Sequence, residues 1–256
     1  MQLIRYTHKN ALHFGRLDAD GETIHVLKGD LFAHQATGKK VKRADVKIEA
    51  PLKPGKIVAL WNQFHALAAK LGQSAPKEPL YFLKSTSAVI ATEEAIKKPQ
   101  QFEGKVIFEG ELGIVIGKTA RNVSEADAPA YILGYTCVND VTAVDLLKRD
   151  PTFDQWSRSK SFDTFCPLGP TICTDLDLAT ARIVVTLDGV ERQNYPVSDM
   201  VFSPAKLVAL ISQDMTLEAG DVIACGTSVG AGTMKPGNRV EVSIVGVGAL
   251  DNPYQA

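Results

Sequence analysis

Residues 106–118 read Val106-Ile-Phe-Glu-Gly-Glu-Leu-Gly-Ile-Val-Ile-Gly-Lys118, an apolar run interrupted by two glutamates. The β-branched residues and the glycine near the end of this run predict a strand. Side chains alternate between the two faces of a strand, so Glu109 and Glu111 point the same way. Phe108 and Leu112 point the other way, toward the core. The strand therefore presents two neighbouring carboxylates on one of its faces.

Two carboxylates on one face repel each other, and burial of an unpaired charge costs several kcal/mol or drives protonation. A positive group between them removes both penalties, and a hard divalent cation fits converging oxygen ligands. The same Glu-x-Glu pattern also occurs on the solvated face of exposed strands. From this stretch alone, a metal site and a solvated surface are both open.

The composition favours a globular protein without a nucleic-acid partner. The 256 residues include 28 Lys and Arg and 29 Asp and Glu, a formal net charge of −1, and no basic run suggests phosphate contacts. No apolar run approaches the length that spans a membrane, and no signal-like segment opens the sequence. The cysteines lack C-x-x-C spacing, which favours a cytoplasmic protein with reduced thiols. They are Cys137, Cys166, Cys173 and Cys225.

Two regions are expected: a small N-terminal β domain over residues 1–52 and a larger catalytic domain over residues 53–256. Within the first region, strand patterns over residues 12–17 and 23–27 flank a hairpin signal at Asp20-Gly21. The prolines and the glycine that follow this region mark a boundary near residue 52.

His65 and Lys84 fall in the first elements of the larger region. Residues 56–60 predict a short strand, and the Ala- and Leu-rich residues 61–71 predict a helix. His65 lies beside the apolar stripe of this helix, where a packed residue is a more common role for a lone histidine than catalysis. Residues 80–84 predict another strand, which ends in Lys84. The apolar stripe consists of Trp61, Phe64, Ala68 and Leu71.

Asp140 and Lys160 fall in the middle of the chain. A Ser-x-x-Asp capping pattern and a terminal glycine predict a helix over residues 124–133. Residues 134–140 then predict a strand that ends at Asp140, where this carboxylate would complete an oxygen cage with the two glutamates. Residues 150–170 lack periodicity and contain three prolines, which predicts a long functional loop that carries Lys160.

The last third of the chain predicts further hairpin and strand elements. Residues 183–187 and the strand after Asp188-Gly189 predict a second hairpin. Ser203-Pro204 marks a helix start, with a cap residue followed by proline in the first turn. Residues 220–227 and about 239–245 predict the final strands.

Gly226-Thr-Ser-Val-Gly230 matches the G-x-S-x-G nucleophile elbow of serine hydrolases. That motif requires a helix after the serine and a histidine later in the chain. The residues that follow are rich in glycine and contain a proline, and no histidine occurs after His65. A serine hydrolase is therefore excluded. Gly230-Ala-Gly232 opens no helix either, which argues against a dinucleotide-binding fold.

Several runs, taken in order over about residues 54–256, resemble the fumarylacetoacetate hydrolase family. The resemblance is to the branch of 2-hydroxyhepta-2,4-diene-1,7-dioate isomerases and 5-oxopent-3-ene-1,2,5-tricarboxylate decarboxylases. It implies a β-rich α+β fold with a mixed β-roll core, a small N-terminal β domain, and usually a homodimer. The matching runs are Phe108 to Lys118, Gly134-Tyr-x-x-x-Asn-Asp-Val-Thr-Ala143, Lys160-Ser-Phe-Asp-Thr164, Pro167-Leu-Gly-Pro170, Asp199-Met-Val-Phe202 and Leu217 to Thr227.

The resemblance also implies roles for individual residues. Glu109, Glu111 and Asp140 fall on the ligands of the family's magnesium or manganese ion. Lys160 falls on its active-site lysine and His65 on its lid histidine, so the resemblance favours a catalytic role for both. The residues assigned to substrate binding are Lys84, Gly226 and Thr227.

Three positions depart from the family's hydrolytic pattern. The glutamate that follows the lid histidine by three residues, and that activates water with it, is replaced by Ala68. The arginine and glutamine that clamp the substrate are replaced by Val144 and Leu147. The cation site is therefore complete in the sequence, whereas the water-activating and clamping sets are not.

These features favour isomerisation or decarboxylation of an unsaturated 2-oxo dicarboxylate from the degradation of aromatic compounds. A 2-oxo acid would chelate the metal, which as a Lewis acid stabilises negative charge on an enolate oxygen. Three carboxylates, one divalent ion and Lys160 sum to zero charge. Two alternatives remain open: a C–C hydrolase of acylpyruvates in which His65 alone handles the water, and a catalytically weak paralogue that binds metal and 2-oxo acids.

Overall fold

Three sheets carry the fold of the computed structural model, which describes residues 1–256. The largest is a 12-stranded sheet whose path runs from the N-terminal strands to the middle of the molecule. In spatial order it contains β4 (His34–Lys42), β3 (Thr23–Gly29), β2 (Ala11–Leu17), β1 (Gln2–His8), β14 (Cys166–Cys173), β12 (Ile132–Asn139), β11 (Gly110–Ile116), β17 (Val222–Ala224), β6 (Ile57–Trp61) and β7 (Leu80–Lys84), with β5 (Lys47–Ile48) beside β1 and β8 (Val89–Ile90) beside β14.

Two smaller sheets complete the fold, and the 5-stranded one packs against the large sheet. A 3-stranded sheet has the order β13 (Thr142–Ala143), β10 (Val106–Phe108) and β18 (Gly232–Thr233). A 5-stranded sheet has the order β16 (Val190–Pro196), β15 (Arg182–Leu187), β19 (Arg239–Ile244), β20 (Gly248–Gln255) and β9 (Ile96–Lys97). Most neighbours are antiparallel, but β6 and β17, β8 and β14, and β9 and β20 are parallel. The expected β-rich fold with a mixed core is confirmed.

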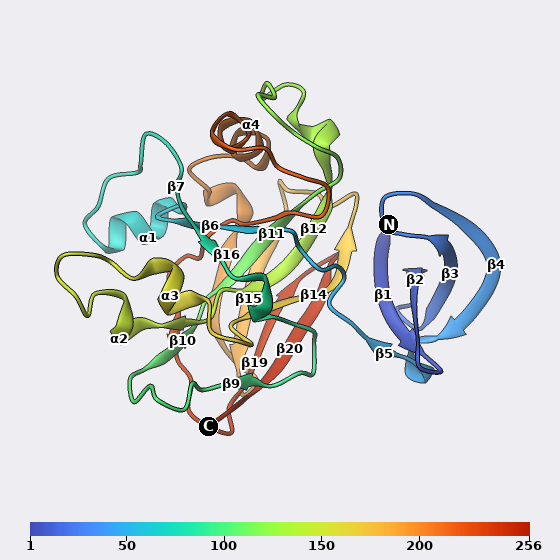
Figure 1. Ribbon diagram of the computed structural model, residues 1–256, viewed down its shortest axis with the longest axis horizontal. Helices are drawn as coiled ribbons and strands as arrows, with labels where there is room; N and C mark the ends of the chain where they lie inside the picture. Colours follow the sequence, from blue (N-terminus) through green and yellow to red (C-terminus); the bar gives the residue numbers. More distant parts are fainter.

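The helices are few and short. They are α1 (His65–Lys70), α2 (Val144–Leu147), α3 (Trp156–Lys160) and α4 (Pro204–Asp214). Figure 1 shows α1, α2 and α3 at the end of the molecule opposite the N-terminal strands. Ser203 caps α4 as expected, because its side chain accepts a hydrogen bond from the Lys206 N–H at 3.1 Å. No helix has the length and apolar character needed to cross a membrane.

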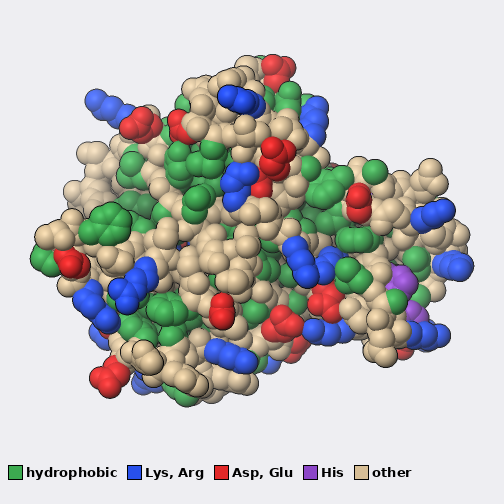
Figure 2. All heavy atoms as spheres, viewed as in Figure 1, with side chains coloured by type: hydrophobic (Ala, Val, Ile, Leu, Met, Phe, Trp, Pro, Cys, Tyr) green, Lys and Arg blue, Asp and Glu red, His purple; other side chains and the backbone are tan.

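Strands β1 to β5 form a lobe that stands apart from the body of the molecule in Figure 1. The lobe has a small apolar core of its own, and the predicted hairpin joins β2 to β3. It connects to the body through the pairing of β1 with β14, in which Gln2 lies opposite Cys173. On the face drawn in Figure 2, basic and acidic side chains are interspersed over lobe and body. The domain boundary near residue 52 stays a prediction.

Strand β11 is buried over its whole length, Glu111 included. Its neighbours β12 and β17 cover its two edges, and the 5-stranded sheet packs against it through β15. A strand that is covered on both faces is apolar nearly throughout, which explains the run of Ile and Val residues. The alternative of a solvated strand face is therefore wrong for Glu111.

The predicted single strand over residues 106–118 is in fact two strands in two sheets. β10 ends at Phe108 and β11 begins at Gly110, so Glu109 lies at the break. The predicted strand over residues 220–227 is likewise shorter, because Gly226 adopts a positive φ of 78° that ends regular extended structure.

Two predicted helices are wrong in extent or in kind. The helix expected over residues 61–71 begins only at His65, because Asn62 has a φ of 55° in the left-handed region and cannot continue a helix. Trp61 instead ends β6, and Leu71 is 46% exposed. Residues 124–133 form only a 3₁₀ turn over Ala128–Tyr131 before β12 begins.

The predicted long loop over residues 150–170 is also wrong, because it contains α3 and the start of β14. Lys160 is the last residue of α3 rather than a loop residue. Strand β20 after residue 247 was not expected at all. No helix follows Ser228, which confirms that the G-x-S-x-G match is not a nucleophile elbow.

Candidate metal centre

Three carboxylates converge where β10 gives way to β11. Oxygen atoms of Glu109, Glu111 and Asp140 all lie within 4.8 Å of one another. The register of β11 and β12 produces this cluster, because Gly110 lies opposite Asn139 and the Asp140 N–H donates to the Glu109 carbonyl at 2.8 Å. The Glu111 and Asp140 residues are 0% exposed, and the Glu109 side chain is 12% exposed. The cluster therefore opens toward solvent on the side of Glu109.

Two lysine ammonium groups neutralise most of this charge. Lys160 Nζ lies 2.6 Å from Glu109 Oε2 and 2.5 Å from Asp140 Oδ2. Lys84 Nζ lies 2.5 Å from Asp140 Oδ1. The sum of charges expected from the sequence included Lys160 but not Lys84. With both lysines, three carboxylates leave one net negative charge, and one divalent ion would turn this into one net positive charge.

Burial and the lysines set the protonation of the cluster. Burial raises the pKa of Glu111 well above its usual range, and it raises the pKa of Glu109 although Lys160 opposes the shift. Burial acts the same way on Asp140, but Lys160 and Lys84 outweigh it and lower the pKa of that carboxyl. Burial disfavours the charged form of Lys160, yet the carboxylates around it raise the pKa of this lysine. Asp140 and Lys160 are therefore the firmly charged pair of the cluster.

Glu111 supplies the observation that points to a cation. Its Oε2 accepts a hydrogen bond from the Gly226 N–H at 2.8 Å, but its Oε1 is buried without any hydrogen-bond partner. A buried carboxylate oxygen without a partner is costly, and native structures rarely leave one. Oxygen ligands from three carboxylates suit Mg²⁺ or Mn²⁺. The residues of the cluster thus fit a divalent metal ion.

Gly226 and Thr227, which the family resemblance assigns to substrate binding, lie beside the carboxylates. The Gly226 N–H binds Glu111, and the Thr227 hydroxyl donates to the Gly110 carbonyl at 3.0 Å. An ideal Cβ on Gly226 would lie 3.0 Å from the Leu60 carbonyl oxygen, so the end of β6 closes on this turn. Contact of these residues with a substrate carboxylate stays a prediction.

Lys84 is fully engaged within the protein. Besides Asp140, its ammonium group donates to the carbonyl oxygens of Lys160 and Phe165. An ammonium group has three donors, and these three partners use all of them. Lys84 therefore fixes Asp140 and the end of α3, and its role in substrate binding stays a prediction.

His65 is the one predicted site residue that the structure does not join to the cluster. It is the exposed first residue of α1, and none of the hydrogen bonds or ion pairs of the carboxylates involves it. The start of α1 is held by Asp199, whose Oδ2 accepts the Ala66 N–H at 3.0 Å. Ala68, at the position where a water-activating glutamate was sought, is buried at 3% exposure.

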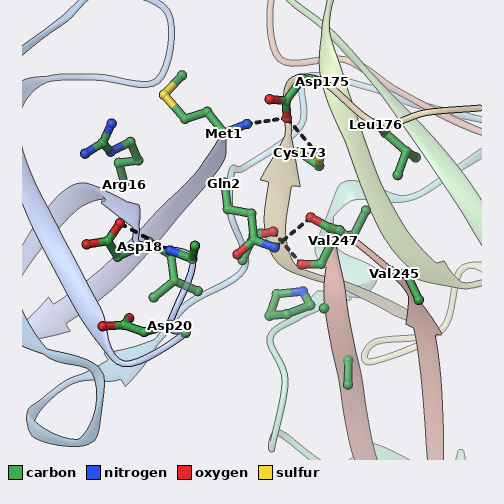
Figure 3. A pocket seen from close by; sticks show the side chains of 18 of the residues that line it. Met1, Gln2, Arg16, Asp18, Asp20, Cys173, Asp175, Leu176, Val245 and Val247 are labelled. Carbon is green, nitrogen blue, oxygen red and sulfur yellow. Dashed lines mark hydrogen bonds and ion pairs between the residues drawn. The ribbon is translucent and has the colours of Figure 1, made fainter.

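A wide groove of about 1040 Å³ lies between the N-terminal lobe and the body. None of the residues that line this groove belongs to the carboxylate cluster. The size of the groove therefore does not identify it as the metal centre. Figure 3 shows the side chains that line it from the two sides: Met1, Gln2, Arg16, Asp18 and Asp20 from the lobe, and Cys173, Asp175, Leu176, Val245 and Val247 from the body.

Replacing Lys84 by methionine tests its structural role. Lys84→Met leaves Asp140 Oδ1 and two carbonyl oxygens without their donor, so we expect a loss of about 3–5 kcal/mol in the free energy of unfolding. Urea denaturation measures this loss. The control is Lys47→Met, because Lys47 pairs with Glu94 at the surface and its loss should cost about 0–1 kcal/mol. Equal effects of the two substitutions would contradict the assignment.

Removing one ligand charge tests the metal site. The wild-type protein should gain about 2.7 kcal/mol of stability at a Mn²⁺ concentration of about 100 times Kd. Glu111→Gln keeps an acceptor for the Gly226 N–H but removes the charge, so this gain should disappear while the fold survives. Thermal unfolding with and without Mn²⁺ measures both effects. The exposed substitution Glu103→Gln should retain the full gain, and a gain retained by Glu111→Gln would refute the site.

Two family models together match nearly the whole chain. Residues 56–255 match the family model described as Fumarylacetoacetate (FAA) hydrolase C-terminal, and residues 1–51 match the one described as Rv2993c-like, N-terminal. The 5-carboxymethyl-2-hydroxymuconate delta-isomerase of Mycobacterium smegmatis is 36% identical, with a TM-score of 0.92 over 100% of this chain and 99% of that one.

A second solved structure, the 2-hydroxyhepta-2,4-diene-1,7-dioate isomerase of Mycobacterium marinum, is 35% identical, with a TM-score of 0.89 over 100% of this chain and 98% of that one. Oxaloacetate tautomerase YisK of Bacillus subtilis is 35% identical over 82% of this chain and 73% of its own length. The first family model matches residues 56–255, which is well over half of the chain and includes all three carboxylates. This chain therefore belongs to the fumarylacetoacetate hydrolase family.

Proposed function

We propose that the protein is a metal-dependent isomerase of an unsaturated 2-oxo dicarboxylate, with decarboxylation of such a compound as the closest variant. The observation that carries the proposal is the buried cluster of three carboxylates, which fits a divalent ion but contains no histidine–carboxylate pair for water. Relatives named as isomerases and a tautomerase support a proton shift as the reaction.

The charges of the cluster suit an anionic substrate. A divalent ion held by Glu109, Glu111 and Asp140 would supply Lewis-acid stabilisation of negative charge on the substrate's 2-oxo oxygen. The protein's own contribution is Lys160, whose raised pKa keeps it cationic beside Glu109 at the solvent-facing side of the cluster. Lys160 thus attracts and orients a carboxylate of the substrate, and Lys84 keeps Asp140 in place.

The residues of α1 disfavour hydrolysis. Cleavage of a C–C bond by water requires a general base within hydrogen-bond reach of that water. His65 is exposed and lacks a carboxylate partner three residues on, where Ala68 is buried. A proton shift between carbon atoms needs no attacking water, but it needs a base that removes the proton from one carbon atom and an acid that returns it to the other. The missing pair is therefore a requirement that is specific to hydrolysis.

Three aromatic side chains in contact with one another extend from Lys160 and suit an unsaturated carbon chain. The Phe82 ring centroid is 5.4 Å from Lys160 Nζ and 5.4 Å from the Trp156 ring, which stacks on it at an interplanar angle of 25°. Trp61 contacts Trp156 at 5.1 Å. All three rings are partly exposed, so this cluster extends from the charged centre to the surface.

The hydrolase alternative is favoured by the name of the matching family model, and the weak-paralogue alternative by the half-buried apolar side chains of Val144 and Leu147. The homodimer implied by the family resemblance and the cytoplasmic location favoured by the cysteine spacing also stay predictions. Light scattering of the purified protein tests the dimer.

A side-by-side assay decides the reaction. With Mg²⁺ or Mn²⁺, the protein should convert unsaturated 2-oxo dicarboxylates faster than it cleaves acylpyruvates, because a poorly oriented base forfeits much of the roughly 10²–10⁴-fold that base catalysis contributes. Absorbance follows the enol, and product analysis separates isomer, CO₂ and cleavage products. Acylpyruvate cleavage that is faster by about an order of magnitude would establish the hydrolase instead. No turnover of either substrate would favour the binding paralogue.

The aromatic cluster gives a second test. Trp156→Ala removes the ring that stacks on Phe82, and we expect KM for the unsaturated substrate to rise up to about tenfold, since an aromatic pair contributes about 0.5–1.5 kcal/mol beyond its buried area. Phe153→Ala is the control, because Phe153 is 69% exposed and belongs to no aromatic pair. An unchanged KM in Trp156→Ala would remove the cluster from the substrate site.

A further inference from the structure

A side chain at position 110 would collide with the 5-stranded sheet. Gly110 is the single residue between Glu109 and Glu111, at the point where the chain passes from the 3-stranded to the 12-stranded sheet. An ideal Cβ on Gly110 would lie 2.2 Å from Val185 Cγ2 of β15. The 5-stranded sheet therefore packs directly on the backbone between two metal-ligand candidates.

Two side chains of β16 hold both backbone groups of Gly110. Gln193 Oε1 accepts the Gly110 N–H at 3.0 Å, and the Tyr195 hydroxyl donates to the Gly110 carbonyl. Gln193 also donates to the Thr227 hydroxyl at 2.9 Å, and Thr227 in turn donates to the same carbonyl. Gln193 and Tyr195 are 1% and 4% exposed. Water therefore does not compete for these hydrogen bonds, which are strong in such surroundings.

The sheet geometry aims these side chains at Gly110. Gln193 and Tyr195 are two residues apart, so they share one face of β16. Gln193 lies opposite Val185, the residue that touches Gly110, and the register of β15 and β16 shifts directly after this pair. An irregularity of this kind redirects a side chain. On the other side of the break, Asn139 Oδ1 accepts the Glu109 N–H at 3.1 Å.

We propose that Gln193 and Tyr195 are positioning residues of the metal centre, which fix the relative aim of Glu109 and Glu111 by holding the backbone of Gly110. Side chains two residues apart on a strand are separated by about 6.6 Å along it, whereas the ligand oxygens here lie within 4.8 Å of one another. Their convergence depends on the backbone between them. The inference rests on the metal centre of the proposed function and adds residues that do not touch the ion.

Two substitutions test the positioning role through metal binding alone. Gln193→Leu removes the acceptor of the Gly110 N–H and the donor to Thr227. Tyr195→Phe removes only the hydroxyl and keeps the ring, which packs edge-on against Phe64 at 4.9 Å. We expect Kd for Mn²⁺, measured by calorimetry, to rise about 10- to 100-fold in each variant, as loss of groups behind metal ligands typically does.

Asn252→Leu is the matched control for lost stability. Asn252 lies in β20 of the same 5-stranded sheet, is 1% exposed, and donates to the carbonyl oxygens of Ala91 and Glu94 at 2.8 Å each. It makes no contact with the break at Gly110. Asn252→Leu should lower the midpoint of thermal unfolding about as much as Gln193→Leu while leaving Kd for Mn²⁺ unchanged.

The outcomes separate the two levels of the proposal. Wild-type affinity in a folded Gln193→Leu or Tyr195→Phe variant would overturn the positioning role, and so would an equal loss of affinity in Asn252→Leu. If Gln193→Leu does not fold, the milder Tyr195→Phe decides. Absence of Mn²⁺ binding by the wild-type protein would overturn the proposed metal centre, and the positioning role with it.

Discussion

The mutual repulsion of three buried carboxylates is the constraint on which this structure depends. Each carboxylate loses hydration on burial, and the attraction within a single ion pair would not offset this free-energy cost for all three. The chain answers by bringing Lys84 from the end of β7 and Lys160 from the end of α3 to Asp140, the most deeply paired of the three. These elements are far apart in sequence, so the charge balance of one site ties the large sheet to the short helices around it.

Lys84 and Lys160 both form an ion pair with Asp140, but their roles differ. The ammonium group of Lys84 donates all three of its hydrogen bonds to protein atoms, and its side chain is buried. Its role is therefore structural. Lys160 lies beside Glu109, the one ligand candidate with an exposed side, and faces the Phe82 ring. In the proposed function, a substrate would reach the cluster on the side of Glu109, where Lys160 and Phe82 lie. An apolar ring and a cation at this side would suit the proposed anion with an unsaturated carbon chain.

Local patterns carried most of what the sequence could predict. The hairpin of β2 and β3, the Ser203 cap and the carboxylate at the end of β12 follow from residues close together in the chain, and all three are present. The break at Glu109 and the partners of Lys84 depend on contacts across sheets, which no local pattern encodes. The helix over residues 61–71 failed for a different reason, because the left-handed backbone of Asn62 depends on its tertiary setting.

Hydrolysis and isomerisation can share one carboxylate cluster, because both begin by stabilising charge on the same substrate oxygen. They differ in whether a water is held and activated beside it. In this chain α1 exposes His65 and buries Ala68, one helical turn apart, so the face that a water-activating carboxylate would need is apolar and packed. A glutamate introduced at that position would have to enter the core, at a cost of several kcal/mol. If the proposed function is correct, the packing of α1, rather than the metal centre itself, is what directs this protein away from hydrolysis.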